Sequence, residues 1–371
     1  MSRRSAAKTM SGAGWSGPGD WLPICEKSIG KFRVRGRVTY RSGVQNPLRL
    51  RSSRVTLGLL AATAFLLSAC ASAGEPATKT VTKTTGAGSS TASSAASSGS
   101  AKASPKPIPT KPVHIKLFNE DGSRYGVGMP VIAFFNKKIT SAKPLQDATT
   151  VTVNGKPAKG AWYFEYSQYL KGYPIEAHFR LQTYWPAHSR IHVSIPAKGL
   201  SAGRGLTFDD SLTSDFTTGP ANIAVVNNIT HEMTVTTDGH FYGRFPVSLG
   251  ASNTPTARGT KVIMEKGRSI CMSGPGYNEC GVKYTQRLTY GGEYLHSAPW
   301  NISNIRRGIN SSNGCTNLLP SDAQRLYGFL RIGDVVQYPN ADGPEMSLGA
   351  GYGDWNIDWG TWQTGGLVST V

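Results

Sequence analysis

The chain has 371 residues and a formal net charge of +18 at neutral pH, and its length allows more than one domain. The charge is unevenly distributed, because residues 1–69 carry a net +10 and residues 71–113 a net +4, which leaves about +4 for the rest. That remainder has no dense run of arginine and lysine with interleaved aromatic residues, so the composition argues against nucleic-acid binding.

The first 69 residues have the features of an export signal. An apolar run at 55–67 follows a segment with three arginines and leads into a Leu-Ser-Ala-Cys sequence that ends at Cys70. The run is too short to span a bilayer, which takes about 20 residues, and its flanks are typical of a signal peptide. The four residues resemble a bacterial lipobox, so we expect cleavage before Cys70 and a lipid anchor on it. A buried apolar segment with a free thiol is the alternative.

Neither flank of this signal predicts a folded domain. Residues 1–43 precede a signal that is already complete, so we expect translation to begin at Val38 or Val44, because some bacterial start codons read as valine when internal. Residues 70–113 are Ser, Thr, Ala, Gly, Lys and Pro with almost no bulky apolar side chains, and cannot bury enough surface to offset their chain entropy. We expect a disordered tether that recurring prolines stiffen.

From His114 the pattern changes to short strands and turns. Residues 131–135 form a compact apolar run, residues 151–153 alternate before the hairpin signal Asn154-Gly155, and residues 191–195 alternate again. About a hundred residues of this kind predict a β-sandwich of immunoglobulin type over 114–219, without a disulfide of its own.

A second, mainly β domain is predicted over 220–340. Its strand patterns fall at 223–226, 233–235, 241–249, 261–264, 290–296 and 335–338. One helix is expected, starting with a capping box of Ser321 and Gln324 and ending at Gly333-Asp334. Its buried face would consist of Ala323, Leu326, Tyr327 and Leu330. We expect further helical insertions between His296 and Cys315.

Export determines how the five cysteines are interpreted. Cleavage before Cys70 removes Cys25 and leaves Cys271, Cys280 and Cys315 in an oxidising compartment, where nearby pairs tend to close. Cys271 and Cys280 are nine residues apart across a turn of Ser, Gly and Pro, so we predict a disulfide between them and a free, reactive Cys315. Three reduced and buried thiols are the alternative.

The residues around Cys315 are those that acyl transfer through a thiolate requires. Cys315 follows Gly314 and lies nineteen residues after His296. The thiolate can attack a carbonyl, the imidazole can hold and return the proton, and backbone N–H groups at the turn can bind the oxyanion. Because cysteine and histidine also fill protein cores, a structural thiol and a structural histidine are the alternatives. The other histidines lack metal-ligand spacing and are expected to be surface or core residues: His114, His178, His188, His192, His231 and His240.

These motifs resemble those of the L,D-transpeptidases of bacterial cell-wall synthesis, specifically the actinobacterial lipoprotein type. The family signature reads His, a spacer, then Ser-His-Gly-Cys-x-Asn, and residues 296–300 and 312–317 are similar to it. The likeness covers roughly 114–366 and includes two segments of the sandwich and the tryptophan-rich stretch at 354–359. It implies an immunoglobulin-like domain, a YkuD-like catalytic domain, and a tail over 341–371 that packs on the catalytic domain.

The resemblance implies an exported acyltransferase that cross-links peptidoglycan. Cys315 would attack the third residue of a tetrapeptide donor stem, D-Ala would leave, and the side-chain amine of an acceptor stem would take the acyl group from the thioester. His296 would act as base and then acid, oriented by the carbonyl of Ser297, with Gly314 and Cys315 as oxyanion donors. No metal or other cofactor is expected, because one peptide bond is broken and another is made.

The resemblance also assigns a substrate pocket. Tyr277 matches a lid residue, Met272 and Trp300 match apolar lid and pocket positions less firmly, and Ser312 and Asn317 belong to the motif around the cysteine. A purely structural role for Tyr277 and Met272 is equally open. The family binds carbapenems covalently, so these are expected inhibitors.

One residue departs from the family pattern. Asn313 stands where the family usually has histidine, and we expect it to alter rate or substrate preference rather than abolish activity. An exported L,D-carboxypeptidase or other cysteine hydrolase, and an inactive wall-binding scaffold, are the alternative functions.

Overall fold

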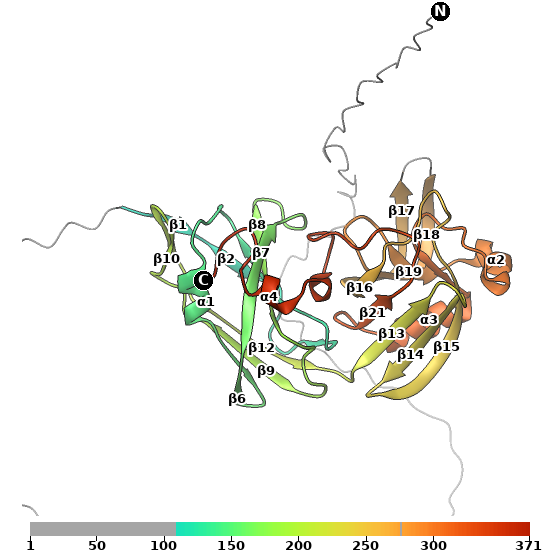
Figure 1. Cartoon of the computed structure of the whole chain (residues 1–371), viewed down its shortest axis with the longest axis horizontal. Coiled ribbons are helices and arrows are strands. Elements are labelled where there is room, and N and C mark those ends of the chain that lie inside the picture. The colour runs from blue at the N-terminus through green and yellow to red at the C-terminus, as the bar shows by residue number, and fades with distance from the viewer. Residues whose placement is uncertain (1–108, 275–276) are drawn as a thin grey trace, which may run out of the picture. The chain divides into compact units, whose positions relative to one another are not determined.

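The structure is a computed structural model that describes residues 109–274 and 277–371 (Figure 1). The predicted export signal, Cys70 and nearly all of the predicted tether lie outside the described residues. The described chain is mainly β, which confirms the predicted fold class. None of its helices is long and apolar enough to cross a membrane.

The first domain is a sandwich of two sheets. One sheet has the order β2 (Ile115–Leu117), β4 (Val131–Phe135), β8 (Ile175–Leu181) and β7 (Gly160–Tyr166). The other has the order β3 (Arg124–Tyr125), β12 (Leu212–Thr218), β9 (Arg190–Ile195), β5 (Thr150–Val153) and β6 (Lys156–Ala158). A small sheet of β1 (Lys111–Val113), β11 (Leu206–Phe208) and β10 (Ser201–Gly203), and the helix α1 (Lys143–Ala148), complete it.

The local sequence explains two of these strands directly. All five residues of β4 are buried, as expected for a continuous apolar run that has other elements on both faces. The predicted hairpin joins β5 to β6 through Asn154 and Gly155, which have φ values of 52° and 77°. Both residues tolerate the left-handed region that a two-residue hairpin turn requires, so the turn prediction is confirmed.

The second domain is built on one nine-stranded sheet. Its order is β16 (Gly259–Val262), β21 (Val335–Tyr338), β13 (Asn222–Asn227), β14 (Glu232–Thr237), β15 (His240–Ser248), β20 (Thr316–Leu318), β19 (Tyr294–Ser297), β18 (Tyr277–Arg287) and β17 (Glu265–Gly274). The helical elements are η1 (Pro299–Asn301), α2 (Ile302–Arg307) and α3 (Pro320–Phe329). As expected, η1 and α2 lie between His296 and Cys315. The predicted strand at 290–296 starts only at Tyr294, because a turn at 289–292 precedes it.

The predicted capping box of α3 is wrong. The cap is Leu319, two residues before the predicted Ser321 and without a side-chain hydrogen bond, and the helix ends at Phe329, before the predicted end at Gly333-Asp334. Pro320 lies in its first turn. Proline is favoured in this position because its φ suits the helix and it lacks an N–H that would need a partner. Ser321 therefore lies inside the first turn, while Ala323 and Leu326 are buried as predicted.

The C-terminal segment contacts both domains. It contains η2 (Asp354–Asn356) and α4 (Trp359–Trp362). Asn356 exchanges two hydrogen bonds with the backbone of Thr260 in β16. Trp362 is fully buried against β7, where its ring stacks on Tyr163 with centroids 4.9 Å apart. This segment therefore joins the sandwich and the nine-stranded sheet through direct contacts.

Candidate active site

Cys315 and His296 come from neighbouring strands of the nine-stranded sheet. β19 and β20 pair in parallel, with Leu295 opposite Thr316 and His296 opposite Asn317. Cys315 directly precedes β20. Gly314 before it has a φ of 103°, a backbone conformation that side-chain-bearing residues rarely adopt, so glycine is required there. The sheet register thus brings two side chains nineteen residues apart in sequence to one place.

One cleft of about 350 Å³ contains most of the residues that the sequence singled out. The predicted residues that line it are Cys315, His296, Asn313, Ser312, Asn317, Tyr277, Met272 and Trp300. Ser297 and Gly314 contribute backbone groups beside it. The lining residues that sequence reasoning missed are Glu279, Val282, Asn301, Asn304 and Ser311. They gave no pattern in the sequence, because they become neighbours only when the β17–β18 hairpin, η1, α2 and the loop before Cys315 come together.

The imidazole of His296 is held in one orientation. Its Nδ1 donates a hydrogen bond to the backbone carbonyl of Ser297, 2.9 Å away, which leaves Nε2 as the basic nitrogen. Trp300 stacks on the ring with centroids 5.9 Å apart. Burial lowers the pKa of His296, and the hydrogen bond to Ser297 offsets only part of that effect. The ring is therefore neutral at neutral pH.

The thiol of Cys315 is also neutral in this environment. Its Sγ is 3.5 Å from the carbonyl oxygen of Gly292, to which it donates a weak hydrogen bond. Burial raises the pKa of Cys315 to about 12, although a backbone hydrogen bond from Tyr294 acts in the opposite direction. A neutral thiol beside a neutral imidazole can act as a nucleophile only if the proton leaves as the attack occurs.

Backbone and hydroxyl groups fix the loop that carries the cysteine. Ser312 Oγ donates to the carbonyl of Cys315 over 2.6 Å and accepts from the N–H of Gly314 over 3.2 Å. Thr256 Oγ1 donates to the carbonyl of Gly314 over 2.9 Å and accepts from Gly250. Both carbonyls of the turn are therefore occupied, so the loop has little freedom to move.

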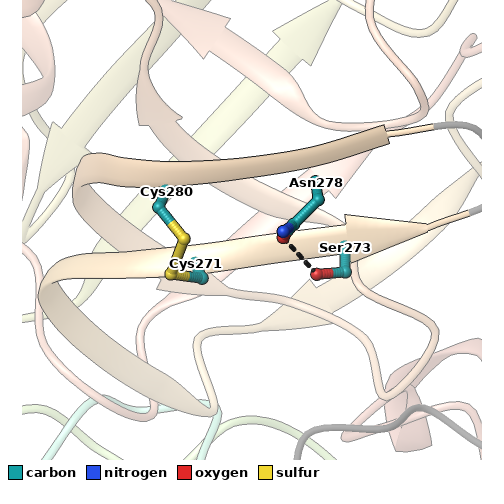
Figure 2. Close-up of a disulfide and its surroundings, with 4 residues drawn as sticks. All are labelled: Cys271, Ser273, Asn278 and Cys280. Carbon is teal, nitrogen blue, oxygen red and sulfur yellow. Dashed lines mark hydrogen bonds between the residues drawn. A yellow bond between two sulfur atoms is a disulfide. The ribbon is translucent and has the colours of Figure 1, made fainter.

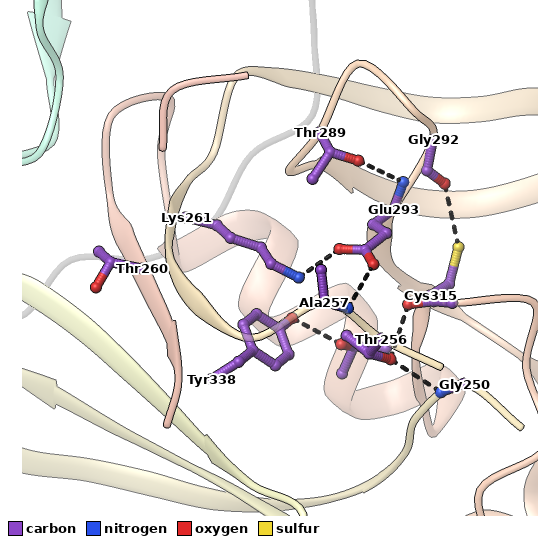
Figure 3. A network of polar contacts seen from close by, with 12 residues as sticks. Gly250, Thr256, Ala257, Thr260, Lys261, Thr289, Gly292, Glu293, Cys315 and Tyr338 are labelled. Carbon is purple, nitrogen blue, oxygen red and sulfur yellow. Dashed lines mark hydrogen bonds and ion pairs between the residues drawn. The ribbon is translucent and has the colours of Figure 1, made fainter. Parts of the chain in front are cut away.

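A buried ion pair lies behind this loop (Figure 3). Lys261, with no exposed surface, donates to Glu293, whose other oxygen accepts the N–H of Ala257 over 2.8 Å. The ammonium group is also 4.1 Å from the ring centroid of Tyr338. Sequence reasoning missed this pair, although a lysine at the head of the apolar run at 261–264 was a possible signal. Lys261 lowers and Glu293 raises the pKa of Cys315.

The predicted disulfide is confirmed. Cys271 on β17 and Cys280 on β18 are bonded across the hairpin (Figure 2). Cys315 is the free cysteine of the described residues, as predicted. Nearer the tip, Ser273 donates to Asn278 over 2.7 Å, and Met272 and Tyr277 from the same hairpin line the cleft. The covalent bond therefore restrains the strands that form this wall of the cleft.

Two asparagines of the cysteine motif differ in their surroundings. Asn313 is exposed at the cleft, where its side chain is open to solvent. Asn317 is buried, and its Oδ1 has no hydrogen-bond partner in the described part of the chain. A buried acceptor without a partner is costly. Asn317 lines the cleft, but this oxygen has almost no exposed surface, so a bound group would reach it only if the side chain turned toward the cleft.

Comparisons with known proteins agree with this geometry. Residues 221–337 match the family model of the L,D-transpeptidase catalytic domain, and residues 68–201 match that of a bacterial Ig domain. L,D-transpeptidase 2 of Mycobacterium tuberculosis (strain CDC 1551 / Oshkosh) is 30% identical over 66% of this chain, and the match spans 60% of that relative. L,D-transpeptidase 5 of Mycobacterium tuberculosis (strain ATCC 25618 / H37Rv) is 28% identical over 68% of this chain, and the match spans 56% of that relative.

Two further relatives are matched over most of their length. Probable L,D-transpeptidase 3 of Mycobacterium tuberculosis (strain ATCC 25618 / H37Rv) is 30% identical over 58% of this chain and 82% of its own length. The solved structure of the LD transpeptidase LdtMt1 in complex with imipenem has a TM-score of 0.50 and 27% identity, covering 62% of this chain and all of that one. With a catalytic domain of this kind, and a relative matched over four fifths of its length, this chain belongs to the L,D-transpeptidase family.

Proposed function

We propose that this protein cross-links the third residues of two peptidoglycan stem peptides through a thioester on Cys315. The observation that carries the proposal is that Cys315, directly before β20, and His296, on the adjacent parallel strand β19, line one cleft, with His296 Nδ1 hydrogen-bonded to Ser297. This arrangement supplies a nucleophile and an oriented base in a site that a peptide can enter.

In the first step, Sγ of Cys315 attacks the carbonyl carbon of the third residue of a donor tetrapeptide. Nε2 of His296 takes the thiol proton during the attack, because the raised pKa of Cys315 leaves almost no thiolate beforehand. The bond to the terminal D-Ala then breaks, and the imidazolium returns its proton to the departing amine. The product is a thioester and free D-Ala.

In the second step, the side-chain amine of an acceptor stem attacks the thioester. His296 takes a proton from that amine, and the thiol recovers its own as the new amide forms. Since one acyl bond replaces another, the residues of the cleft complete both steps with one base and one nucleophile.

The oxyanion of both steps needs N–H donors at the cysteine turn. We assign the N–H of Cys315 as the first donor. The N–H of Gly314 is the second, but it is occupied by Ser312 Oγ at 3.2 Å, so Ser312 must release it when substrate binds. A donor aimed at the developing charge is worth about 3–4 kcal/mol in acyl transfer, so this exchange affects the rate strongly.

The cleft walls offer recognition for a peptide stem. The exposed rings of Tyr277 and Trp300 can cover apolar parts of the donor, and the side chain of Asn317 could accept a peptide N–H after turning toward the cleft. Asn313 at the open side would contact substrate rather than the reacting atoms. A carbapenem would acylate the same thiol, by analogy with the LD transpeptidase solved in complex with imipenem.

We further propose that a lipid on Cys70 anchors the protein at the outer face of the membrane, with residues 70–113 as the tether.

The test is incubation of the full chain, purified in mild detergent, with disaccharide tetrapeptide, followed by mass spectrometry of the products. A dimer with loss of D-Ala supports transfer. A tripeptide as the sole product would indicate L,D-carboxypeptidase activity instead of transfer. No turnover would favour an inactive scaffold. Cys315→Ala serves as the control and must give no product.

A further inference from the structure

A buried cluster of charged groups lies on the sandwich, away from the cleft. Glu176 and His178 are alternate residues of β8 and therefore point to the same face of the sheet. Glu165 on β7 is directly opposite Glu176 in the antiparallel register. All three side chains are buried, with 5% exposure for Glu165, 0% for Glu176 and 1% for His178.

This arrangement is unfavourable unless something else joins it. Two carboxylates directly opposite each other on paired strands repel, and burial increases that repulsion. Neither oxygen of Glu165 has a hydrogen-bond partner in the described chain, nor has Nε2 of His178. Buried polar atoms normally have partners, so three unpartnered atoms at one point indicate a missing ligand.

The spacing of these atoms fits a metal ion. Nε2 of His178 is 3.6 Å from Oε1 of Glu176 and 3.9 Å from Oε1 of Glu165, which is too long for hydrogen bonds. The ligand atoms of the three residues all lie within 4.8 Å of one another. Ligands bound at about 2.0–2.2 Å to one ion are about 3–4 Å apart, so a small rearrangement would complete the site.

The groups around the cluster orient it for coordination. Both oxygens of Asp354 in η2 contact Nδ1 of His178, at 2.9 and 3.1 Å, so Nδ1 carries a proton and Nε2 faces the glutamates. Histidines that bind metals usually make this contact to a carboxylate through their other nitrogen. Ser167 donates to Oε2 of Glu176 over 2.9 Å, and the hydroxyl of Tyr290 donates a long hydrogen bond of 3.4 Å to Oε1, so the ion would use the second lone pair of Oε1.

The charges of the neighbourhood are consistent with a divalent cation. Glu165 lies close to two other carboxylates, those of Glu176 and Asp354, and each adds to the effect of burial in raising its pKa. The permanent cation Arg180, which lies over the rings of Trp355 and Trp362, acts on Asp354 and Asp358. With a neutral His178, a doubly charged ion would offset most of the negative charge of Glu165, Glu176 and Asp354. Protons on Glu165 and His178 would have the same effect, and the experiment below separates the two.

We propose that Glu165, Glu176 and His178 bind a divalent transition-metal ion, with zinc as the preferred ion. A set of one imidazole and two carboxylates favours zinc over magnesium or calcium, which prefer oxygen ligands alone. Both oxygens of Glu165 are available, so this residue can supply the fourth ligand atom. The ion would fix the C-terminal segment to the sandwich through Asp354. The sequence did not predict this, because the ligands come from two strands and no histidine pair exists.

The experiment uses the full chain in mild detergent with Cys315→Ser, so that the active-site thiol cannot bind zinc. We expect one zinc per chain by elemental analysis, a fall in melting temperature after EDTA treatment, and its recovery on adding zinc chloride. Asp354→Asn should weaken zinc binding about 10–100-fold by calorimetry. Glu165→Gln, which removes a ligand and the repulsion together, should fold and lose the response to zinc. The exposed His192→Gln is the matched control and should behave as the parent.

Two results would overturn the proposal. The first is a parent protein that binds no zinc and does not change its melting temperature on zinc addition, while Glu165→Gln is more stable than the parent. Protons would then hold the cluster together. The second is full zinc binding by Glu165→Gln, which would place the metal elsewhere on the chain.

Discussion

The ion pair behind the cysteine loop gives the sharpest mutational prediction. Lys261→Met removes a fully buried ammonium and leaves the Glu293 carboxylate, itself largely buried, without its charge partner. Breaking a buried pair in this way typically costs about 3–5 kcal/mol, whereas replacing both partners is often close to neutral. We therefore expect Lys261→Met to lose about 3 kcal/mol in unfolding free energy. The double variant with Glu293→Gln should recover most of it, because glutamine can still accept the Ala257 N–H.

The same ion pair also shifts the pKa of Cys315, and a loss of stability alone would not produce the opposite shifts expected for its two members. Lys261 lowers the pKa of Cys315 and Glu293 raises it, so Lys261→Met should shift the pH profile of thiol alkylation upward. Glu293→Gln should shift it downward. Both single variants should also slow acylation by imipenem, by roughly 10–100-fold if the loop moves by about an ångström.

Chemical denaturation measures the first effect, and iodoacetamide alkylation followed by intact mass measures the second. Both assays should use the four members of the double-mutant cycle. The reasoning would be refuted if the two single variants shifted the alkylation profile in the same direction. It would also be refuted if the double variant were as unstable as the two singles combined.

Four further predictions concern the site itself. His296→Ala should reduce the rate of acylation by imipenem by at least about 100-fold, and Asn313→Ala far less, because only the first removes the base; equal losses would reverse these roles. The lowered pKa of His296 keeps the base neutral down to pH values below its usual 6.5, so the acylation rate should fall only below that pH. Alkylation of Cys315 should instead keep rising from pH 7 toward its pKa of about 12, and a plateau between pH 6 and 9 would indicate a preformed thiolate. Removing the Cys271–Cys280 bond by a double serine variant should cost about 2.6 kcal/mol by the loop-closure estimate and raise KM for the donor more than it lowers kcat. An unchanged KM would separate the hairpin from donor binding.

The strands could be predicted from the sequence where the pattern was local. The alternation at 191–195 predicts a strand, and the Asn154-Gly155 pair predicts a hairpin turn, from neighbouring residues alone. The structure has β9 and the β5–β6 hairpin at these positions. The disulfide was predictable for the same reason, since both cysteines belong to one hairpin. The capping box failed because Pro320 competes for the start of the same helix.

The two buried groups of charged residues could not be predicted, because each forms between segments that are distant in the sequence. Lys261 and Glu293 lie on different elements and meet only when β16 and the turn before β19 are assembled. Glu165 and His178 also come together only through the register of β7 and β8. Asp354, much later in the chain, completes that cluster. Sequence periodicity fixes which face a residue occupies, but not which distant residue shares that face.

The most direct test of the central claim is to trap the acyl-enzyme. The full chain is mixed with disaccharide tetrapeptide, quenched with acid within seconds, digested, and the peptide that contains Cys315 is analysed by mass spectrometry. The account predicts a hydroxylamine-sensitive adduct on Cys315 equal in mass to the donor minus D-Ala, and its faster loss when an excess of amine acceptor is added with His296 intact. Cross-linked product formed without any adduct on Cys315, or by a Cys315→Ala variant, would contradict it.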